Sequence, residues 1–323
     1  MPTLRVREIY NEFFTKTGYP GLPLTEVFVV KTTNRAREIP LVFEAVGPDI
    51  SGKAVALKAN YNSADPFPAR THLETLRALA ATIMDREPDS LTLLERSGMG
   101  STRDVLQRCR VEETLSPLGA EVIALDELPV LGWSHIPPEG THWRTGLFLP
   151  KRLLSSGAVI QTCCLKTHRF GGHFTLSLKN SVGLLAKTVP GSAHNFMQEL
   201  HSSPFQRQMI AEINRAYLVD MVLMDAMEGF VTGGPEDGER ISPGLLIGSR
   251  DRVAIDAAGV ALLRSYGSTP EVMNGRIFSL DQIARAAELG VGCTDPQEIE
   301  LIPLTSESKS AAKRIAKILR EEG

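Results

Sequence analysis

The chain has 323 residues, a net charge of −3, 42% hydrophobic residues and 23% charged residues. This length suits one large or two modest domains, and the composition is that of an ordinary globular protein. The acidic balance and the 6% aromatic content argue against a nucleic-acid partner, which usually selects basic surfaces and stacking rings. No segment approaches the ~20 apolar residues that cross a bilayer, and the N-terminus lacks a signal-peptide core. We therefore expect a cytoplasmic protein with no membrane partner.

Apolar runs alternate with amphipathic segments along most of the chain. The predicted strands span residues 26–32, 53–60, 90–95, 121–125, 158–165, 219–226, 244–249 and, at an edge, 298–304. The predicted helices span residues 35–46, 71–85, 101–109, 203–218, 251–266, 280–289 and 306–322. Because strands that alternate with helices indicate βαβ units, we predict an α/β fold with a mainly parallel sheet and helices on both faces. Two lobes, 24–150 and 151–304, would surround a central cleft, and a C-terminal helix would occupy 305–323.

Local signals refine three of these elements. If residues 35–46 form a helix, Pro40 has to lie in its first turn, since proline lacks a backbone N–H. Thr71 followed by Glu74 resembles a capping box, and Asp251 is the expected N-cap of a later helix. Residues 128–150 are rich in proline and hold both tryptophans, which predicts either a lid or a packed surface loop.

The four cysteines, Cys109, Cys163, Cys164 and Cys293, form no C-x-x-C pair. The sequence therefore lacks the usual iron–sulfur and zinc-ribbon spacings. Neighbouring residues of a strand face opposite sides, so Cys163 and Cys164 are expected to pack on the two faces of one buried strand. Such thiols fit a reducing compartment.

Residues 155–195 contain the strongest indication of a functional site. The apolar run 158–165 is bounded by turn signals, which predicts an interior strand of a parallel sheet. Lys166 and His168 follow it directly, and Lys179 comes shortly afterwards. Ligands of open α/β sheets bind beyond the carboxyl ends of the strands. Charged groups are costly to bury there unless they meet a ligand, so we predict a site at this edge.

Polar residues also follow the other predicted strands. They are Lys58 and Asn60; Glu95, Arg96 and Ser97; Lys166 and His168; and Asp225 and Glu228. Because the carboxyl ends of parallel strands share one edge of the sheet, these groups are expected to meet in a common cleft. The alternative is that each strand simply exits into a polar loop.

Four residues are candidates for catalysis. A lysine among other cations has a lowered pKa and can act as a nucleophile or base, so Lys166 and Lys179 suit either this role or the binding of a carboxylate or phosphate. His168 would transfer a proton. Asp225, at the end of an otherwise apolar strand, would orient a ligand or a metal.

Further residues are candidates for ligand binding. Glycine pairs allow a ligand to approach the backbone closely, although neither pair here matches a Walker A loop or a dinucleotide fingerprint, and plain turns explain them equally well. The ligand-binding candidates are Lys58, Asn60, Gly171, Gly172, Asn180, Glu228, Gly233 and Gly234. Histidine ligates metals through its neutral imidazole, so His168, His173 and His194 are candidate ligands of a divalent metal, although their spacing matches no standard zinc signature.

Five segments together resemble the "domain of unknown function 362" family. They are KANYN at 58–62, CLKTH at 164–168, SLKNSVGLL at 177–185, DAMEGFVTGGP at 225–235 and SRDRVAIDA at 249–257. The resemblance extends from roughly residue 53 to 304 and implies an α/β fold, with residues 1–323 as one family unit. It implies no settled reaction. Some relatives carry a ferredoxin-like iron–sulfur segment, whose cysteines this chain lacks.

A fainter resemblance is to the nickel-pincer lactate racemase family. In that family a strand ends in a histidine, and a glycine-rich turn, a cofactor-tethering lysine and a second histidine follow. The matching order here is His168, Gly171-Gly172, Lys179 and His194, but residues 175–178 replace the family's run of glycines before the lysine.

Three functions remain open from the sequence. The first is an enzyme that binds a small anionic metabolite or cofactor in a Lys/His/Asp cleft. The second is a metal-dependent racemase or isomerase with a nickel-pincer cofactor. The third is a non-catalytic scaffold for a cofactor or partner, in which Lys58, Glu95 and Asp225 form a fixed network of ion pairs. The sequence defines neither the substrate nor the oligomeric state.

Overall fold

The computed structural model describes residues 24–171 and 173–323, which form an α/β fold around one large sheet. The strands are β1 (Thr25–Lys31), β2 (Ala54–Lys58), β3 (Ser90–Glu95), β4 (Glu121–Ala124), β5 (Trp133–Ile136), β6 (Leu147–Pro150), β7 (Ala158–His168), β8 (His173–Thr175), β9 (Met221–Phe230), β10 (Arg240–Ile241), β11 (Leu245–Ser249) and β12 (Ile299–Pro303). The helices are α2 (Arg35–Val46), α3 (Leu73–Met84), α4 (Thr102–Arg108), α5 (Val111–Leu115), α6 (Lys151–Leu154), α7 (Ser177–Asn180), α8 (Phe196–Ser202), α9 (Gln206–Ile213), α10 (Arg252–Arg264), α11 (Pro270–Met273), α12 (Asp281–Glu288) and α13 (Lys309–Glu322). The predicted fold class is confirmed.

The main sheet has ten strands, eight of them in the order β12-β1-β11-β9-β7-β2-β3-β4. Within this order β11 is antiparallel to both of its neighbours, β1 and β9. The remaining neighbours are parallel to one another. Because β1 lies between β11 and β12, strands from both predicted lobes are hydrogen-bonded into one sheet.

Strand β7 is the central element that leads into the site. All eleven of its residues are buried, as expected for an interior strand with both faces covered. The strand continues three residues past its predicted apolar run because β8 folds back and pairs with its carboxyl end. The hairpin therefore keeps Lys166 and His168 in extended backbone.

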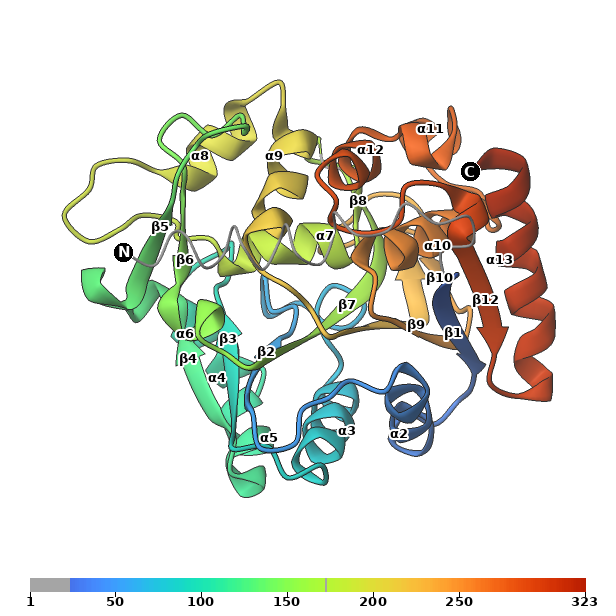
Figure 1. Cartoon of the computed structure of the whole chain (residues 1–323), viewed down its shortest axis with the longest axis horizontal. Coiled ribbons are helices and arrows are strands. Elements are labelled where there is room, and N and C mark those ends of the chain that lie inside the picture. Colours follow the sequence, from blue (N-terminus) through green and yellow to red (C-terminus); the bar gives the residue numbers. More distant parts are fainter. Residues whose placement is uncertain (1–23, 172) are drawn as a thin grey trace.

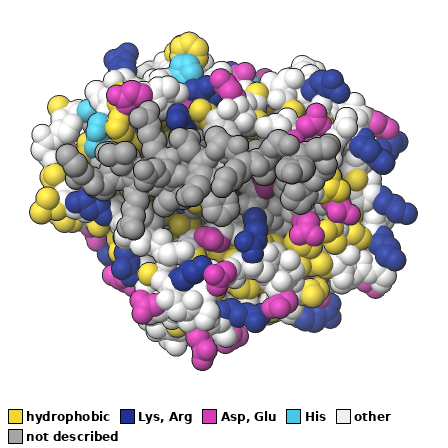
Figure 2. Space-filling model, in the orientation of Figure 1, with side chains coloured by type: hydrophobic (Ala, Val, Ile, Leu, Met, Phe, Trp, Pro, Cys, Tyr) yellow, Lys and Arg dark blue, Asp and Glu magenta, His cyan; other side chains and the backbone are white. Residues whose placement is uncertain are grey.

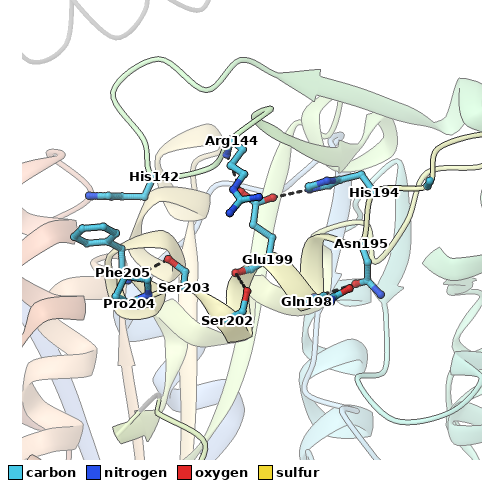
Figure 3. Close-up of a pocket in the computed structure, with 11 residues that line it drawn as sticks. His142, Arg144, His194, Asn195, Gln198, Glu199, Ser202, Ser203, Pro204 and Phe205 are labelled. Carbon is cyan, nitrogen blue, oxygen red and sulfur yellow. Dashed lines mark hydrogen bonds and ion pairs between the residues drawn. The ribbon is translucent and has the colours of Figure 1, made fainter.

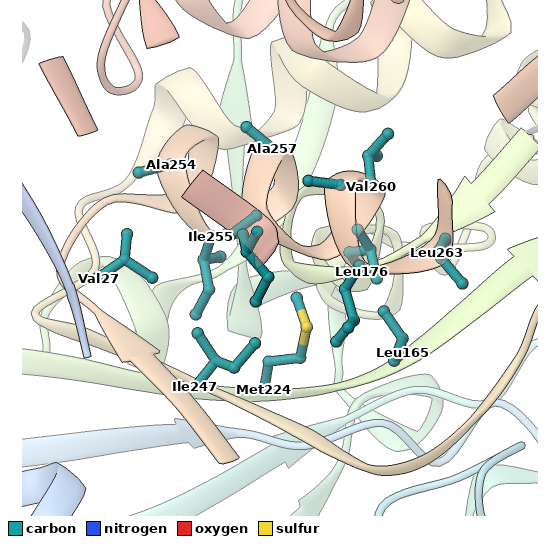
Figure 4. Close-up of a cluster of buried hydrophobic side chains, with 14 of the residues drawn as sticks. Val27, Leu165, Leu176, Met224, Ile247, Ala254, Ile255, Ala257, Val260 and Leu263 are labelled. Carbon is teal, nitrogen blue, oxygen red and sulfur yellow. The ribbon is translucent and has the colours of Figure 1, made fainter. Parts of the chain in front are cut away.

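Helices cover both faces of the sheet (Figure 1). Helices α2, α3 and α5 lie below the sheet in that view, and α7, α10 and α12 lie above it. On the upper side, Ile255 of α10 and Leu176 lie over Met224 of β9 and Ile247 of β11 (Figure 4). A Cβ atom on Gly259 would lie 2.7 Å from Leu176 Cδ1, so α10 approaches the layer beneath it closely. Burial of such side chains contributes ~2 kcal/mol each and fixes the helix layer on the sheet.

Residues 128–150 pack against the body of the protein. Trp133 and Trp143 are 5% and 2% exposed and belong to a buried cluster with Phe196. The indole Nε1 of Trp143 donates a hydrogen bond to the Met209 carbonyl at 3.2 Å. Of the two expectations for this segment, the structure shows the packed loop, which contains the two-stranded sheet β5-β6.

Two local predictions were wrong. Helix α2 begins at Arg35, so Pro40 lies inside it and not in its first turn. The buried residues around Pro40 anchor the helix, and this packing outweighs the missing hydrogen bond. The N-cap of α3 is His72, whose side chain accepts a hydrogen bond from the Glu74 amide, while Thr71 Oγ1 instead accepts from the Asn60 amide. The predicted Asp251 cap of α10 is confirmed.

No helix in the described ranges is long and apolar enough to span a membrane. On the face shown in Figure 2, acidic and basic side chains are interspersed, which fits the small net charge of the chain.

Candidate functional site

A cavity of about 200 Å³ opens beyond the carboxyl ends of β2, β3 and β7. Lys58 and Glu95 are the last residues of β2 and β3, and Lys166 and His168 end β7. Helix α7 supplies Lys179 and Asn180 from the side of the sheet that α10 covers. The cavity therefore lies where open α/β sheets bind their ligands, as the positions of the polar residues predicted.

Lys58 and Glu95 form a buried ion pair in the cavity wall. Lys58 Nζ lies 2.6 Å from Glu95 Oε1 and also donates to the Ala59 carbonyl and, at 3.2 Å, to Asn180 Oδ1. Burial lowers the pKa of Lys58 and raises that of Glu95, while their mutual attraction opposes both shifts. The Tyr61 and Arg96 amides donate to Glu95, which fixes its carboxylate. The charge of Lys58 is thus balanced within the protein.

Arg96 adds a buried charge that pairs with no carboxylate of the described residues. Its guanidinium donates to three backbone carbonyls, those of Leu185, Ser97 and Val182. Only 3% of the residue is exposed, and burial lowers its pKa to about 10. Arg96 lines the cavity and remains positively charged at neutral pH.

Lys166 and Lys179 also lack a carboxylate partner among residues 24–171 and 173–323. Lys166 is fully buried and donates to the Ala69 carbonyl, and burial lowers its pKa. Lys179 is 9% exposed and forms no hydrogen bond with the described residues. Burial, together with the nearby charges of Lys166 and Arg96, lowers its pKa to about 8. Lys179 therefore remains mostly protonated at neutral pH in a poorly solvated place, and burial also disfavours the charged form of Lys166.

His168 faces the same cavity without a hydrogen-bond partner. The residue is 7% exposed, and its Nδ1 atom is buried and unpaired among the described residues. Burial and the adjacent Lys179 and Lys166 lower its pKa far below the usual value. The imidazole is therefore neutral at physiological pH.

Asp256 positions the short helix that carries Lys179. Its Oδ1 atom accepts hydrogen bonds from the Ser177 amide at 2.7 Å and from Ser177 Oγ at 2.5 Å, and its Oδ2 atom accepts from the Leu178 amide at 3.2 Å. Burial raises the pKa of Asp256 to about 7. Nearby Arg252 is a cation that lowers this pKa, and the hydrogen bonds of Asp256 go to the start of α7.

Six of the predicted residues meet at this cavity. They are Lys58, Asn60, Lys166, His168, Lys179 and Asn180. Asn180 is held by a hydrogen bond to the Thr162 carbonyl at 3.0 Å, in addition to its contact with Lys58. The two segments of sequence, around residues 58–60 and 166–180, thus form one site.

Asp225 does not line the cavity, which corrects its predicted place beside the lysines. Its carboxylate is fully buried and lies 2.8 Å from Arg35 Nε, and Thr75 Oγ1 also donates to it. An irregularity in the pairing of β7 and β9 follows Asp225. The side chain is directed toward α2 and α3, where it ties two helices to the sheet. The scaffold alternative predicted that Lys58, Glu95 and Asp225 form one network of ion pairs. Because Asp225 pairs with Arg35 instead, only Lys58 and Glu95 pair with each other.

The other acidic candidate, Glu228, and the described glycine candidates, Gly171, Gly233 and Gly234, also lie outside the cavity. Glu228 forms an exposed ion pair with Arg240. Gly233 and Gly234 have φ values of +71° and +63°, and a Cβ atom on Gly234 would lie 2.0 Å from the Thr167 carbonyl oxygen. These two glycines serve a turn packed against β7, and the neighbouring Pro235 and Glu236 are the residues that line the cavity. The Gly171 carbonyl accepts from Arg207, and Gly172 lies outside the described residues.

The three candidate metal ligands do not converge. His168 lines the cavity, and His173 is its cross-strand neighbour on β8 with a φ of +60°. His194 lines a different cavity, where its Nε2 atom lies 2.5 Å from Glu199. The described residues contain no group of three or more His, Cys, Asp or Glu side chains placed to hold a metal ion. The structure thus gives no support to the three-histidine site, because the residues occupy separate elements.

This second cavity, of about 530 Å³, lies beside α8 (Figure 3). His142 stacks on Phe205 at one end of it, with ring centroids 4.3 Å apart, and His194 lies at the other end. Glu212 and Glu199 pair with the two histidines. Glu212 is 70 positions from His142, so no local pattern in the sequence indicates this pair.

Several cavity residues were missed as ligand-binding candidates. They are Asn62, Glu95, Arg96, Gly98, Met99, Phe170, Thr175, Val182, Gly183, Met197, His201, Pro235 and Glu236. Glu95 and Arg96 were expected in the common cleft as polar residues at a strand end, and Glu95 also in the ion-pair network of the scaffold alternative, but neither was a ligand-binding candidate. Only the structure shows why residue 183 is a glycine: a Cβ atom at this position would lie 2.8 Å from Lys58 Nζ.

Comparison with known proteins places the chain in a family. The family model described as "Domain of unknown function (DUF362)" matches residues 55–261, which is more than half of the 323 residues. No curated protein matches the chain. The matched region contains Lys58, Glu95, Lys166 and Lys179 of the cavity wall. No comparison supports the resemblance to lactate racemases. The chain therefore belongs to the DUF362 family of domains of unknown function.

Proposed function

We propose that this protein is an enzyme that binds a small anionic metabolite in the cavity at the carboxyl ends of β2, β3 and β7. The anion would meet the charges of Lys166, Lys179 and Arg96, and neutral His168 would transfer a proton to or from it. The observation that carries this proposal is the surplus of buried positive charge around a cavity that has room for a ligand.

The cavity has a surplus of positive charge because some of its cations have carboxylate partners and others do not. Glu95 balances Lys58, and Glu236 pairs with Arg169 on the rim. Arg96, Lys166 and Lys179 have no such partner among the described residues. A buried charge without a counter-ion is strongly unfavourable. A bound carboxylate or phosphate removes that cost, because both groups form charge-assisted hydrogen bonds with ammonium and guanidinium donors.

The size of the cavity limits the ligand. At about 200 Å³ it is smaller than the ~300–1,000 Å³ of sites that bind drug-sized molecules, so a small metabolite fits better than a nucleotide. Two buried polar atoms on the wall, His168 Nδ1 and Thr175 Oγ1, lack partners among the described residues. Buried polar groups are nearly always satisfied in folded proteins, so these atoms favour a polar ligand.

Titration calorimetry with lactate, acetate and inorganic phosphate tests the proposal. We expect at least one of these anions to bind the wild-type protein, and Lys179→Met to weaken that binding by roughly tenfold or more, or ~1.4 kcal/mol. Lys187→Met is the matched control, since Lys187 is exposed and does not line the cavity. If none of the anions binds, or if Lys179→Met binds them as well as the wild type, the proposal is wrong.

Two other outcomes would separate the alternatives. Tight anion binding without turnover of any ligand in a broad panel would favour the non-catalytic scaffold. The metal-dependent racemase has no specific support in the geometry, because His194 and His168 line different cavities. We also propose a cytoplasmic location, which is supported by the four buried, unpaired cysteines.

A further inference from the structure

We propose that Lys179 is a nucleophile that forms an imine with a small 2-oxo acid in this cavity. The inference rests on the proposed anion site and names both its substrate class and its covalent residue. A 2-oxo acid carries a carboxylate directly beside a reactive carbonyl, and the cavity offers cations and an unpaired lysine side by side.

The first support is the freedom of the Lys179 amine. The other lysines of the cavity are already engaged: Lys58 by Glu95 and two oxygens, and Lys166 by the Ala69 carbonyl. Lys179 lines the cavity with no hydrogen bond to the described residues. Its backbone is held in place by the hydrogen bonds between Asp256 and the start of α7. A fixed backbone with a free amine is the arrangement that a nucleophilic lysine requires.

The second support is electrostatic. Lysine is a nucleophile only in its neutral form, and desolvation beside other cations increases the neutral fraction. Burial, Lys166 and Arg96 together bring the pKa of Lys179 to about 8. Roughly a tenth of the amine is then neutral at pH 7, compared with fewer than one in a thousand for an exposed lysine.

The third support is the proton acceptor beside the amine. His168 is neutral, is 7% exposed, and has an unpaired Nδ1 atom. Its charged form is disfavoured by Lys179 more than by any other side chain, which places the two groups near each other. One neutral base next to one free amine supplies both groups that imine formation needs.

The chemistry balances without an added oxidant or reductant. The lone pair of neutral Lys179 attacks the carbonyl carbon, a C–N bond forms as the C–O π bond breaks, and the carbonyl oxygen takes up a proton from solvent. His168 accepts the proton that leaves the nitrogen and returns it to the hydroxyl, which departs as water while the C=N bond forms. The protonated imine keeps its positive charge beside the carboxylate. His168 can then remove a proton from the carbon next to the imine carbon, which gives an enamine.

Borohydride trapping with pyruvate tests the inference. We expect the intact mass of the wild-type protein to increase by one reduced pyruvate adduct, and peptide mapping to place the adduct on Lys179. Lys179→Arg keeps the positive charge but cannot form an imine, so it should give no adduct. Lys187→Arg, an exposed control, should be trapped like the wild type. Mapping of the wild-type adduct is decisive even if a variant fails to fold.

Proton exchange gives a second, independent readout. In deuterated water the wild-type protein should exchange the methyl protons of pyruvate, as followed by NMR. Lys179→Arg should abolish this exchange, and His168→Gln should slow it at least tenfold.

The outcomes distinguish this inference from the function on which it rests. If lactate binds and pyruvate gives no adduct, or an adduct on another lysine, the imine is ruled out and the anion site stands. If neither lactate nor pyruvate binds, both are overturned.

Discussion

Lys179 is a cavity residue whose buried charge destabilises the fold. Its ammonium group is buried among cations, and its pKa lies at about 8, below the 10.5 of an exposed lysine. The folded protein thus binds fewer protons than the unfolded chain between these two values. Stability therefore increases as the pH rises through this window, and the full penalty is present below about pH 8.

Replacing this lysine by an uncharged side chain should stabilise the fold. We expect Lys179→Met to raise the free energy of unfolding at pH 7 by up to about 3 kcal/mol, because ~1.4 kcal/mol accompanies each pKa unit. The gain should shrink as the pH rises toward 10. Urea unfolding at several pH values measures it, with Lys187→Met as the control. A variant that is less stable than the wild type at pH 7 would show that the ammonium group is well solvated.

Among the secondary-structure elements, the short helix α7 depends on a neighbour for its position. Its four residues are too few to be stable alone. Asp256 of α10 accepts hydrogen bonds from the Ser177 and Leu178 amides at its start, and α10 itself is buried along its whole length. The buried helix α10 thus holds in place the short helix α7, which carries Lys179 and Asn180 of the cavity.

Asp256→Asn should therefore reduce anion binding more than it reduces stability. The amide retains one acceptor oxygen but turns an NH₂ group toward the Leu178 amide, which displaces α7. We expect roughly tenfold weaker anion binding, or ~1.4 kcal/mol, and a decrease of only a few degrees in the melting temperature. Calorimetric titration and thermal unfolding measure the two effects.

Asp220→Asn is the matched control for this substitution. Asp220 accepts a hydrogen bond from the Val159 amide at 2.8 Å, near the start of β7 and away from the cavity. Its replacement should leave anion binding unchanged. An equal loss of binding in both variants would mean that Asp256 acts through general stability.

Across the whole molecule, the ion pair between Arg35 and Asp225 joins segments 190 positions apart. Arg35 begins α2, Asp225 lies on β9, and Thr75 of α3 donates to the same carboxylate. Arg35 also lies over the Phe67 ring, 4.8 Å from its centroid. The pair thus ties the lower helix layer to the middle of the sheet.

Arg35→Ala should destabilise the fold without weakening anion binding. The substitution leaves the Asp225 carboxylate buried without its cation, so we expect a loss of ~3–5 kcal/mol in the free energy of unfolding. Arg86→Ala is the control, because its ion pair with Glu44 is exposed and should contribute at most ~1 kcal/mol. Urea unfolding and lactate titration test both variants. Weaker lactate binding by folded Arg35→Ala would show that Asp225 influences the cavity after all.

The sequence by itself determined the elements and the edge of the sheet at which the site lies. Apolar runs that end in Lys58, Glu95 and Lys166 mark interior strands, and parallel strands bring their carboxyl ends together. The spacing of apolar residues and the polarity of side chains are local properties. The strand at 158–165 and the Asp251 cap could therefore be predicted from neighbouring residues alone. The family motifs likewise lie within continuous stretches of the chain.

Only the tertiary structure decided which polar residues share the cavity. Asp225 and Lys166 both lie near strand ends, yet the side chain of Asp225 is directed toward α2 and α3, because the orientation of a strand residue depends on register and irregularities in pairing. Arg96 and Lys179 differ from Lys58 in lacking a carboxylate partner, which depends on contacts between distant segments. Burial and charge pairing arise only when the layers pack, so the surplus of positive charge became visible only in the folded chain.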